Sequence, residues 1–238
     1  MYLKLNELYY DVFDSLDLTT KMHYFTYILN HYSRNTGKEH ILVKFEFVKF
    51  AIRERLFSSG SLKYIRPFPY KVFMLSGLYA GEIEWSEKFI EEYLEKLDPE
   101  IKENMRLYSY AFLYHYKADY LKSIDFISLF KFESEVFTYD MKLMLLKNYY
   151  ELSKTSGAYF ESLNYSLDAF SHYLKDNKKV SASYLADGKK FIAGMKLLIK
   201  ANMLPVTKKE KKDLHYEIEN FLKDSKNFWL VSRLEELL

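Results

Sequence analysis

The side chains that could carry acid–base or metal chemistry are scattered along the 238-residue chain. No two of its histidines have the HExxH spacing that places two zinc ligands and a general base on one helix face. His115 and Asp119 are four residues apart, but Asp119 falls in a predicted turn, so we expect a surface histidine beside a turn acid. Glu91, Glu92 and Glu95 form an acidic helix face of the kind that is usually solvated. The six histidines are His23, His31, His40, His115, His172 and His215.

Motifs for phosphate binding and nucleophilic catalysis are also missing from the sequence. There is no GxxxxGK[ST], GxGxxG or GxSxG pattern, and Ser59-Gly60 is typical of a loop rather than a nucleophile elbow. The absence of cysteine excludes thiol catalysis and disulfides. We therefore expect a protein that is not an enzyme and that has no cofactor and no metal site. An active site assembled from scattered residues is the alternative.

Charge and hydropathy limit the kinds of partner. The formal net charge is +2, from 35 basic and 33 acidic residues, whereas nucleic-acid binders usually carry a basic excess. The one basic cluster, at residues 208–212, is interrupted by Glu210, so we expect an exposed first helical turn rather than a phosphate site. Helical repeats can also read single-stranded RNA, but that needs a basic groove and a regular code of side chains. Neither is visible, so no nucleic-acid partner is expected.

The sequence likewise predicts no membrane partner. Mean hydropathy is −0.29. No apolar run approaches the ~18–20 residues that a membrane-spanning helix needs. The first 17 residues carry acids where a signal peptide needs bases. These features favour a cytoplasmic protein.

Helical periodicity runs through the chain. Near the N-terminus, the apolar stripe of residues 2–16 contains Leu5, Leu8, Tyr9, Val12 and Phe13. A further helix is predicted for residues 40–57, with Ile41, Phe45, Val48, Ile52 and Leu56 on its stripe.

The segment from Leu107 to Phe130 is the clearest structural signal. Leu107, Tyr110, Ala111 and Tyr114 lie at i, i+3, i+4 and i+7, on one stripe of a helix. Residues 117–119 interrupt the apolar pattern, and helical spacing resumes afterwards. Because each of the two helices has one apolar face to bury, they must fold back antiparallel. The segment therefore predicts a helical hairpin.

This hairpin resembles the tetratricopeptide repeat, whose pattern W-x2-L-G-x2-Y, A-x3-F and P extends over about 34 residues. Asp119-Tyr120 is similar to the family's turn between the two helices, and Ser123 and Ile127 stand where the family has Ala and Phe. The chain has Leu in place of Trp and lacks the closing Pro.

The same pattern recurs 35 residues earlier. Tyr79 and Trp85 fall at the positions of Tyr114 and Tyr120, and Ser76 replaces the small Ala111. In the second helix, Lys88 and Glu92 fall on the expected Ala and Phe positions and fit poorly.

The resemblance extends from Tyr64 to the C-terminus, where the chain looks like the C-terminal part of a poorly characterised group of bacterial tetratricopeptide-like proteins with no assigned activity. Its supporting segments are residues 85–90, 149–152, 190–192 and 228–230. It implies an all-α fold of antiparallel helical hairpins stacked into a right-handed superhelix of roughly ten to twelve helices. An irregular helical bundle is the alternative.

The composition places a boundary near residue 60, where Ser58-Ser59-Gly60-Ser61 interrupts the helical pattern. Residues 1–60 are then N-terminal helices, either a degenerate repeat or the continuation of missing upstream repeats. Residues 61–238 form the repeat domain, with the last helix as a C-terminal cap.

The resemblance also implies a binding surface, because the first helix of each hairpin lines the concave face of such arrays. The chain contains 23 Tyr and 19 Phe, and packing in the core is the alternative role for most of them. The residues expected to line this concave face are Tyr70, Phe73, Met105, Tyr108, Phe112, His115, Tyr116, Lys147 and Tyr150.

These features predict a scaffold that binds another protein or a peptide. The alternative is a structural protein that assembles with copies of itself. The helical start of the chain and the Leu-rich segment Leu234 to Leu238 favour that homo-oligomer modestly.

Overall fold

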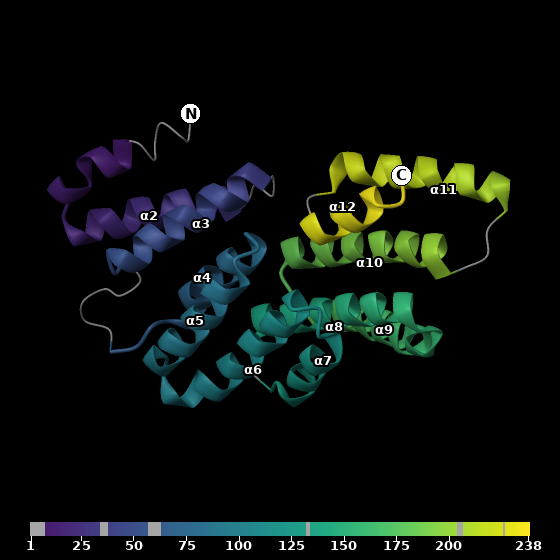
Figure 1. Cartoon of the computed structure of the whole chain (residues 1–238), viewed down its shortest axis with the longest axis horizontal. Coiled ribbons are helices and arrows are strands. Elements are labelled where there is room, and N and C mark those ends of the chain that lie inside the picture. Colours follow the sequence, from purple (N-terminus) through teal and green to yellow (C-terminus); the bar gives the residue numbers. More distant parts are fainter. Residues whose placement is uncertain (1–7, 34–37, 57–62, 132–133, 204–206, 226) are drawn as a thin grey trace. The chain divides into compact units, whose positions relative to one another are not determined.

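The computed structural model describes residues 8–33, 38–56, 63–131, 134–203, 207–225 and 227–238. Within these ranges the chain forms α-helices and short 3-10 helices, and the only β pairing is an isolated bridge between Ile65 and Leu97 (Figure 1). The all-α prediction is confirmed.

The chain divides into two compact units, residues 1–117 (unit 1) and 118–238 (unit 2). The predicted boundary near residue 60 is therefore wrong, because helix α3 (Lys38–Arg53) packs on helix α4 (Pro67–Tyr79) within unit 1. The Ser58–Ser61 segment itself lies outside the described residues.

Unit 1 is a succession of helices in which each packs on the next. Residues 8–12 are helical and lead into a 3-10 turn, η1 (Phe13–Ser15). Helix α4 contacts three others: α3, α5 and α6. The remaining elements are α2 (Leu18–Ser33), α5 (Ile83–Tyr93), η2 (Leu94–Lys96) and α6 (Pro99–Tyr116).

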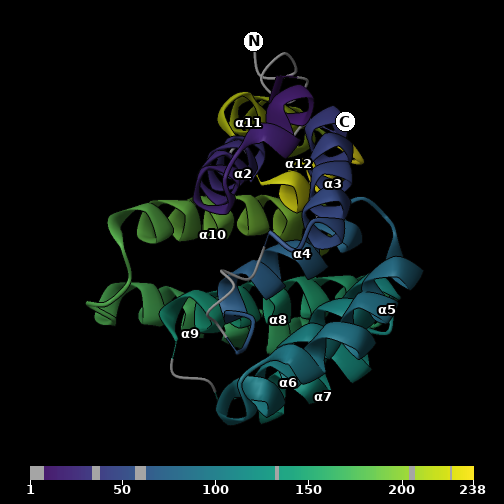
Figure 2. The same ribbon diagram turned by 90° about the vertical axis from the view of Figure 1, so that its left-hand side faces the viewer.

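Unit 2 has the same kind of sequential packing, and helices α8, α9 and α10 lie next to one another in both views (Figures 1 and 2). The last helix, α12, packs on α10 and α11, as the predicted cap would. Helix α10 approaches its neighbours closely at Gly194, where a Cβ atom would lie 2.7 Å from Phe221 and 2.9 Å from Leu230. The elements are α7 (Tyr120–Leu129), α8 (Glu135–Thr155), η3 (Gly157–Tyr159), α9 (Phe160–Asp176), α10 (Ala182–Met203), α11 (Lys208–Asp224) and α12 (Phe228–Glu235).

Local sequence explains where several helices begin. Asp98 accepts a hydrogen bond from the Glu100 amide at 3.0 Å, and Pro99 occupies the first helical position of α6. Thr207 and Glu210 form a reciprocal capping box at the start of α11. Both helix starts were visible in the sequence.

The connections after α4 and α6 have the same local backbone pattern. A residue with positive φ lies two positions past the end of each helix, Gly81 (φ 83°) after α4 and Ala118 (φ 58°) after α6. An acidic residue follows each, Glu82 or Asp119, at the N-cap of the next helix. The two turns lie 37 positions apart.

This 37-residue spacing of the connections differs from the predicted spacing of 35. It aligns Ser123 with Ser86 and Ile127 with Ile90, which the sequence analysis expected at the small and large apolar positions of a second helix. Ser86, Ser123 and Ile90 are fully buried. Lys88, which the shorter spacing placed at the small position, is exposed.

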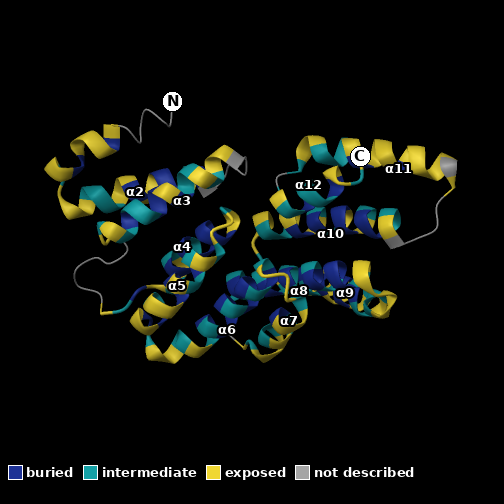
Figure 3. Cartoon of the chain, viewed as in Figure 1, coloured by how far each residue is buried: buried dark blue, intermediate teal, exposed yellow. Residues whose placement is uncertain are grey.

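Burial follows the helix faces that meet. Buried positions run as stripes along neighbouring helices, and exposed positions cover most of α11 (Figure 3). In unit 2 the core consists of Tyr139, Leu146, Tyr150, Leu163, Leu167, Phe170, Leu174, Phe191, Met195, Leu198, Ile199, Leu214, Ile218, Leu230 and Leu234.

Candidate partner-binding site

Most of the residues predicted to line an open concave face are buried. On α6, Met105 and Tyr108 are 0 % exposed, and Phe112 and His115 are buried as well. Tyr116 is partly buried, with its ring centroid 6.1 Å from that of Tyr79. Burial, together with Tyr79, raises the pKa of Tyr116 well above its usual value.

The predicted residues of α4 are also core residues. The Tyr70 hydroxyl is hydrogen-bonded to Ser109 Oγ on α6 at 3.0 Å, and burial raises the pKa of this phenol. The ring of Phe73 lies 6.0 Å from Phe25 and 6.4 Å from Phe89. Because α4 packs on α3, α5 and α6, it needs apolar side chains on more than one stripe.

In unit 2, Tyr150 is buried and Lys147 is partly buried. The Lys147 ammonium lies 5.7 Å from the centroid of the Trp229 ring. Desolvation lowers the pKa of Lys147 to about 8, and the Asp140 carboxylate opposes this shift. The groove prediction is therefore wrong for the seven buried residues. The other two, Tyr116 and Lys147, are only partly buried but belong to different units.

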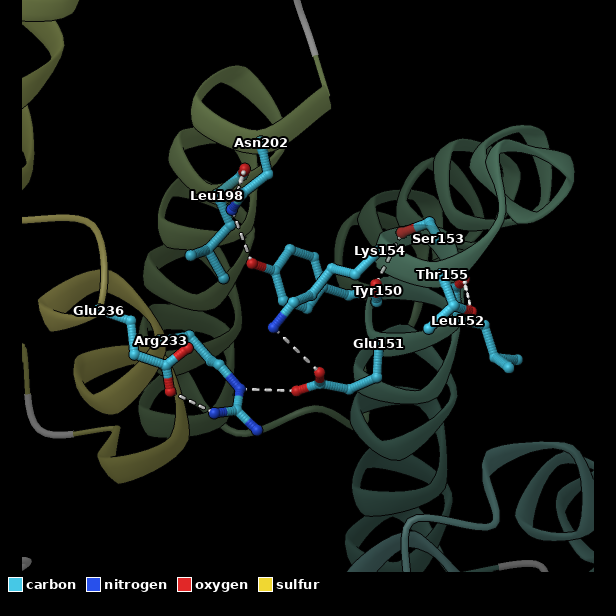
Figure 4. A network of polar contacts seen from close by, with 10 residues as sticks. All are labelled: Tyr150, Glu151, Leu152, Ser153, Lys154, Thr155, Leu198, Asn202, Arg233 and Glu236. Atoms are coloured by element: carbon cyan, nitrogen blue, oxygen red, sulfur yellow. Dashed lines mark hydrogen bonds and ion pairs between the residues drawn. The ribbon is translucent and has the colours of Figure 1, made fainter.

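Tyr150 belongs to a polar network that joins α8, α10 and α12 (Figure 4). Its hydroxyl accepts a hydrogen bond from Asn202 Nδ2 at 2.9 Å. The next residue, Glu151, is 6 % exposed at its side chain and accepts from Arg233 Nε at 2.6 Å. Lys154 lies 3.5 Å from the same carboxylate, and Arg233 also contacts Glu236.

Every charge of this network has an opposite charge beside it, and it contains no free nucleophile or base. Its contacts connect α12 and α10 to α8.

An accessible alternative lies in unit 1, between residues 8–15 and helix α3. It is a pocket of about 810 Å³, which we call the aromatic groove. Aromatic rings form its floor and charged side chains its rim. Its lining residues are Tyr10, Phe13, Asp14, Glu46, Lys49, Phe50, Arg53 and Glu54.

The floor of the aromatic groove is a set of edge-to-face rings. The Phe50 ring lies 4.7 Å from Tyr10 and 4.9 Å from Phe13, in both cases T-shaped. The Arg53 guanidinium is 5.1 Å from the Phe50 centroid. Tyr10 is 41 % exposed, so this aromatic surface is open to solvent. Burial, Tyr32 and Glu46 raise the pKa of Tyr10, and Arg53 opposes them.

The rim carries three carboxylates and two basic groups. Lys49 pairs with Glu46 at 2.6 Å, and Arg53 pairs with Glu54 at 2.9 Å. Among the described residues, Asp14 forms no ion pair, so the rim has one uncompensated negative charge.

The sequence contains a signal for this groove on helix α3. Glu46, Lys49, Phe50 and Arg53 lie at i, i+3, i+4 and i+7 and form one stripe of α3. Phe50 is an aromatic residue outside the apolar stripe predicted for residues 40–57. Tyr10 likewise lies outside the apolar stripe predicted for residues 2–16. The predicted stripes were incomplete, because Phe47 and Ala51 are fully buried too, whereas Leu8 is 57 % exposed.

The described residues hold no cluster of three or more His, Cys, Asp or Glu side chains able to bind a metal ion. In the same part of the chain, no helix is long and apolar enough to cross a membrane. No family profile, curated protein sequence or solved structure matches this chain.

Proposed function

We propose that this protein is a non-enzymatic scaffold that binds a segment of another protein through the aromatic groove. The observation that carries the proposal is the open floor of edge-to-face rings on Phe50, with Tyr10 exposed beside it. Tyrosine and arginine beside apolar rings are the residue types that dominate binding energy at protein interfaces. The groove volume of about 810 Å³ is enough for one or two large side chains of a bound segment.

The charges of the rim suggest what the segment contains. Lys49 and Arg53 are each paired within the rim, which leaves the Asp14 carboxylate to be neutralised. A complementary segment has an aromatic or large aliphatic anchor next to a lysine or arginine. The anchor displaces water from the rings, and the base lies beside Asp14.

The arrangement of the chain supports a tetratricopeptide-like scaffold. Two successive helix connections share a positive-φ residue, an acidic N-cap and a buried serine at a 37-residue spacing. In tetratricopeptide-like arrays, stacked hairpins serve mainly to present binding surfaces. The superhelical arrangement, the absence of an enzymatic activity and a cytoplasmic location are parts of this proposal.

The test is a selection of displayed random peptides on the immobilised chain, followed by affinity measurements with the winning peptides. We expect peptides with an apolar anchor beside a basic residue. Tyr10→Ala should weaken them at least tenfold, about 1.4 kcal/mol. Asp14→Asn should weaken binding less and reduce its salt dependence. Tyr165→Ala is the matched control, because Tyr165 is a 78 % exposed tyrosine on α9, outside the groove.

Circular dichroism must show that each variant is folded. Equal binding by wild type and Tyr10→Ala would refute the proposal, as would the failure to select any peptide. A mass that rises with protein concentration, and that Tyr10→Ala lowers, would instead favour self-assembly through the same surface.

A further inference from the structure

Unit 2 contains a second pocket, which neither the sequence prediction nor the proposed function uses. It has a volume of about 480 Å³ and lies where α8, α10 and α12 meet the end of α11. We call it the C-terminal pocket. Its size is within the range of small-molecule sites, about 300–1,000 Å³. Its lining residues are Tyr139, Leu143, Tyr184, Asp187, Lys190, Phe191, Asp224, Ser225, Asn227 and Leu230.

One wall of this pocket is aromatic. The rings of Tyr139 on α8 and Tyr184 on α10 are 4.7 Å apart and T-shaped. Phe191 and Leu230 add apolar surface. An apolar ligand group finds contact area here, and the faces of aromatic rings also attract cations.

The pocket is also electronegative. The carboxylates of Asp187 and Asp224 belong to its lining, and the only cation among the described lining residues is Lys190. The Lys190 ammonium donates to the backbone carbonyl of Asp224, so part of its charge is already engaged. Burial raises the pKa of both Tyr139 and Tyr184, and the carboxylates of Asp187 and Asp140 raise each further.

A buried hydroxyl in the lining lacks a partner. Ser225 Oγ is inaccessible to solvent and forms no hydrogen bond with any described residue. Because solvent does not reach this hydroxyl, it is not part of the accessible surface of the pocket. Recognition of a ligand therefore depends on the aromatic wall and the acidic residues of the lining.

We propose that the C-terminal pocket binds an organic cation: a protonated amine joined to a small apolar group. The apolar group packs on the aromatic wall, and the positive charge is balanced by Asp187. Such a group is found on a free amine and at the end of a lysine side chain. This inference does not depend on the aromatic groove.

The test is isothermal titration calorimetry of the full chain with four probes. Phenethylammonium carries both features, whereas 2-phenylethanol lacks the charge and 3-phenylpropionate reverses it. N-acetyl-lysine N-methylamide stands for a lysine side chain in a protein. We expect phenethylammonium to bind at least tenfold more tightly than 2-phenylethanol, and 3-phenylpropionate not to bind. The stronger of the two cationic probes identifies the source of the amine.

Two variants assign the binding to this pocket. Asp187→Asn should weaken phenethylammonium at least fivefold, and Asp168→Asn should not change it, because Asp168 is an exposed carboxylate on α9 outside the lining. Binding of 3-phenylpropionate at the strength of the amine would overturn the proposal, as would equal effects of the two Asp→Asn changes or no binding of either cation.

Discussion

The ion pair between Arg233 and Glu151 gives the sharpest test of how unit 2 is held together. Glu151 is 6 % exposed at its side chain and Arg233 is 27 % exposed. Replacing Arg233 with Met keeps most of the aliphatic packing but leaves the buried Glu151 carboxylate without its guanidinium partner. Breaking a buried pair from one side costs about 3–5 kcal/mol. Lys154, at 3.5 Å from the carboxylate, compensates in part, so we expect Arg233→Met to lower the free energy of unfolding by about 2–4 kcal/mol.

The partner substitution should cost less. In Glu151→Gln, Arg233 keeps its contact with Glu236 and is partly solvated, so the expected loss is about 1–2 kcal/mol. Because both changes remove the same interaction, the double variant should lose less than the sum, with a coupling energy of about 1–2 kcal/mol.

The chain offers a direct readout, because it has two tryptophans, Trp85 in unit 1 and Trp229 in unit 2. In a Trp85→Phe background, fluorescence during guanidinium unfolding reports unit 2 alone. Lys200→Met is the matched control. The Lys200 ammonium lies 3.2 Å from the Glu217 carboxylate and joins α10 to α11, but the side chains are 38 % (Lys200) and 47 % (Glu217) exposed. An exposed pair contributes about 0.2–1 kcal/mol. If Arg233→Met costs no more than Lys200→Met, or if the double variant is additive, the network does not hold α12 in place.

Three further predictions follow from single positions. Tyr108→Ala should destabilise unit 1 by about 3–5 kcal/mol, because the ring is fully buried. Trp85 fluorescence during unfolding measures this change. A decrease in the free energy of unfolding below about 1 kcal/mol would mean that the ring is exposed. Gly81→Ala should lower the free energy of unfolding by about 1 kcal/mol, because φ is 83° there; steric crowding adds nothing, since a new Cβ meets no atom within 4 Å. Ala118→Gly should raise the free energy of unfolding by about 0.5–1 kcal/mol, because it removes a Cβ from a residue with positive φ. Both are measured by thermal unfolding, and changes of the same sign would contradict the turn assignment. Because burial lowers the pKa of Lys147 to about 8, the folded chain loses this proton before the unfolded one, so unit 2 should gain stability from pH 8 to about pH 10, where unfolded-state tyrosines begin to ionise. In Lys147→Met this rise should diminish, and an unchanged slope would show that Lys147 is solvated in the folded state.

The helices and several of their ends were predictable because they depend on neighbours in the sequence. Asp98, Pro99 and the Thr207 capping box act within one turn of helix, so their effect can be read directly from the chain. The two helices around residues 107–130 were predictable for a related reason, since the apolar spacing on either side of residues 117–119 is local to the sequence.

The spacing of the two helix connections could not be found by matching residue types. Tyr79 and Trp85 resemble residues that lie 35 positions later, whereas the positive-φ residues of the two connections, Gly81 and Ala118, lie 37 positions apart. Ala rarely adopts positive φ, so its role in the turn is invisible without backbone angles.

The site could not be located because exposure depends on how many neighbours a helix has. Tyr108 and Phe50 are both aromatic residues away from the predicted apolar stripe. Tyr108 lies on α6, which packs on both α4 and α5, and is fully buried; Phe50 lies at an open groove. Periodicity gives the faces of a helix but not the number of partners that cover them.

Hydrogen bonds of tyrosine hydroxyls also fix the position of neighbouring helices along their axes. Four of these hydroxyls form hydrogen bonds with groups 12 to 52 residues away in the sequence. A phenylalanine at the same position could not form such a bond. A Phe ring would fill the same space while allowing a helix to slide by one turn, about 5.4 Å, along its neighbour. With Tyr, such a slide would strand a hydroxyl in the core, so the fold is specified against that shifted alignment. These hydrogen bonds join Tyr9 to Lys21, Tyr70 to Ser109, Tyr173 to Glu135 and Tyr150 to Asn202.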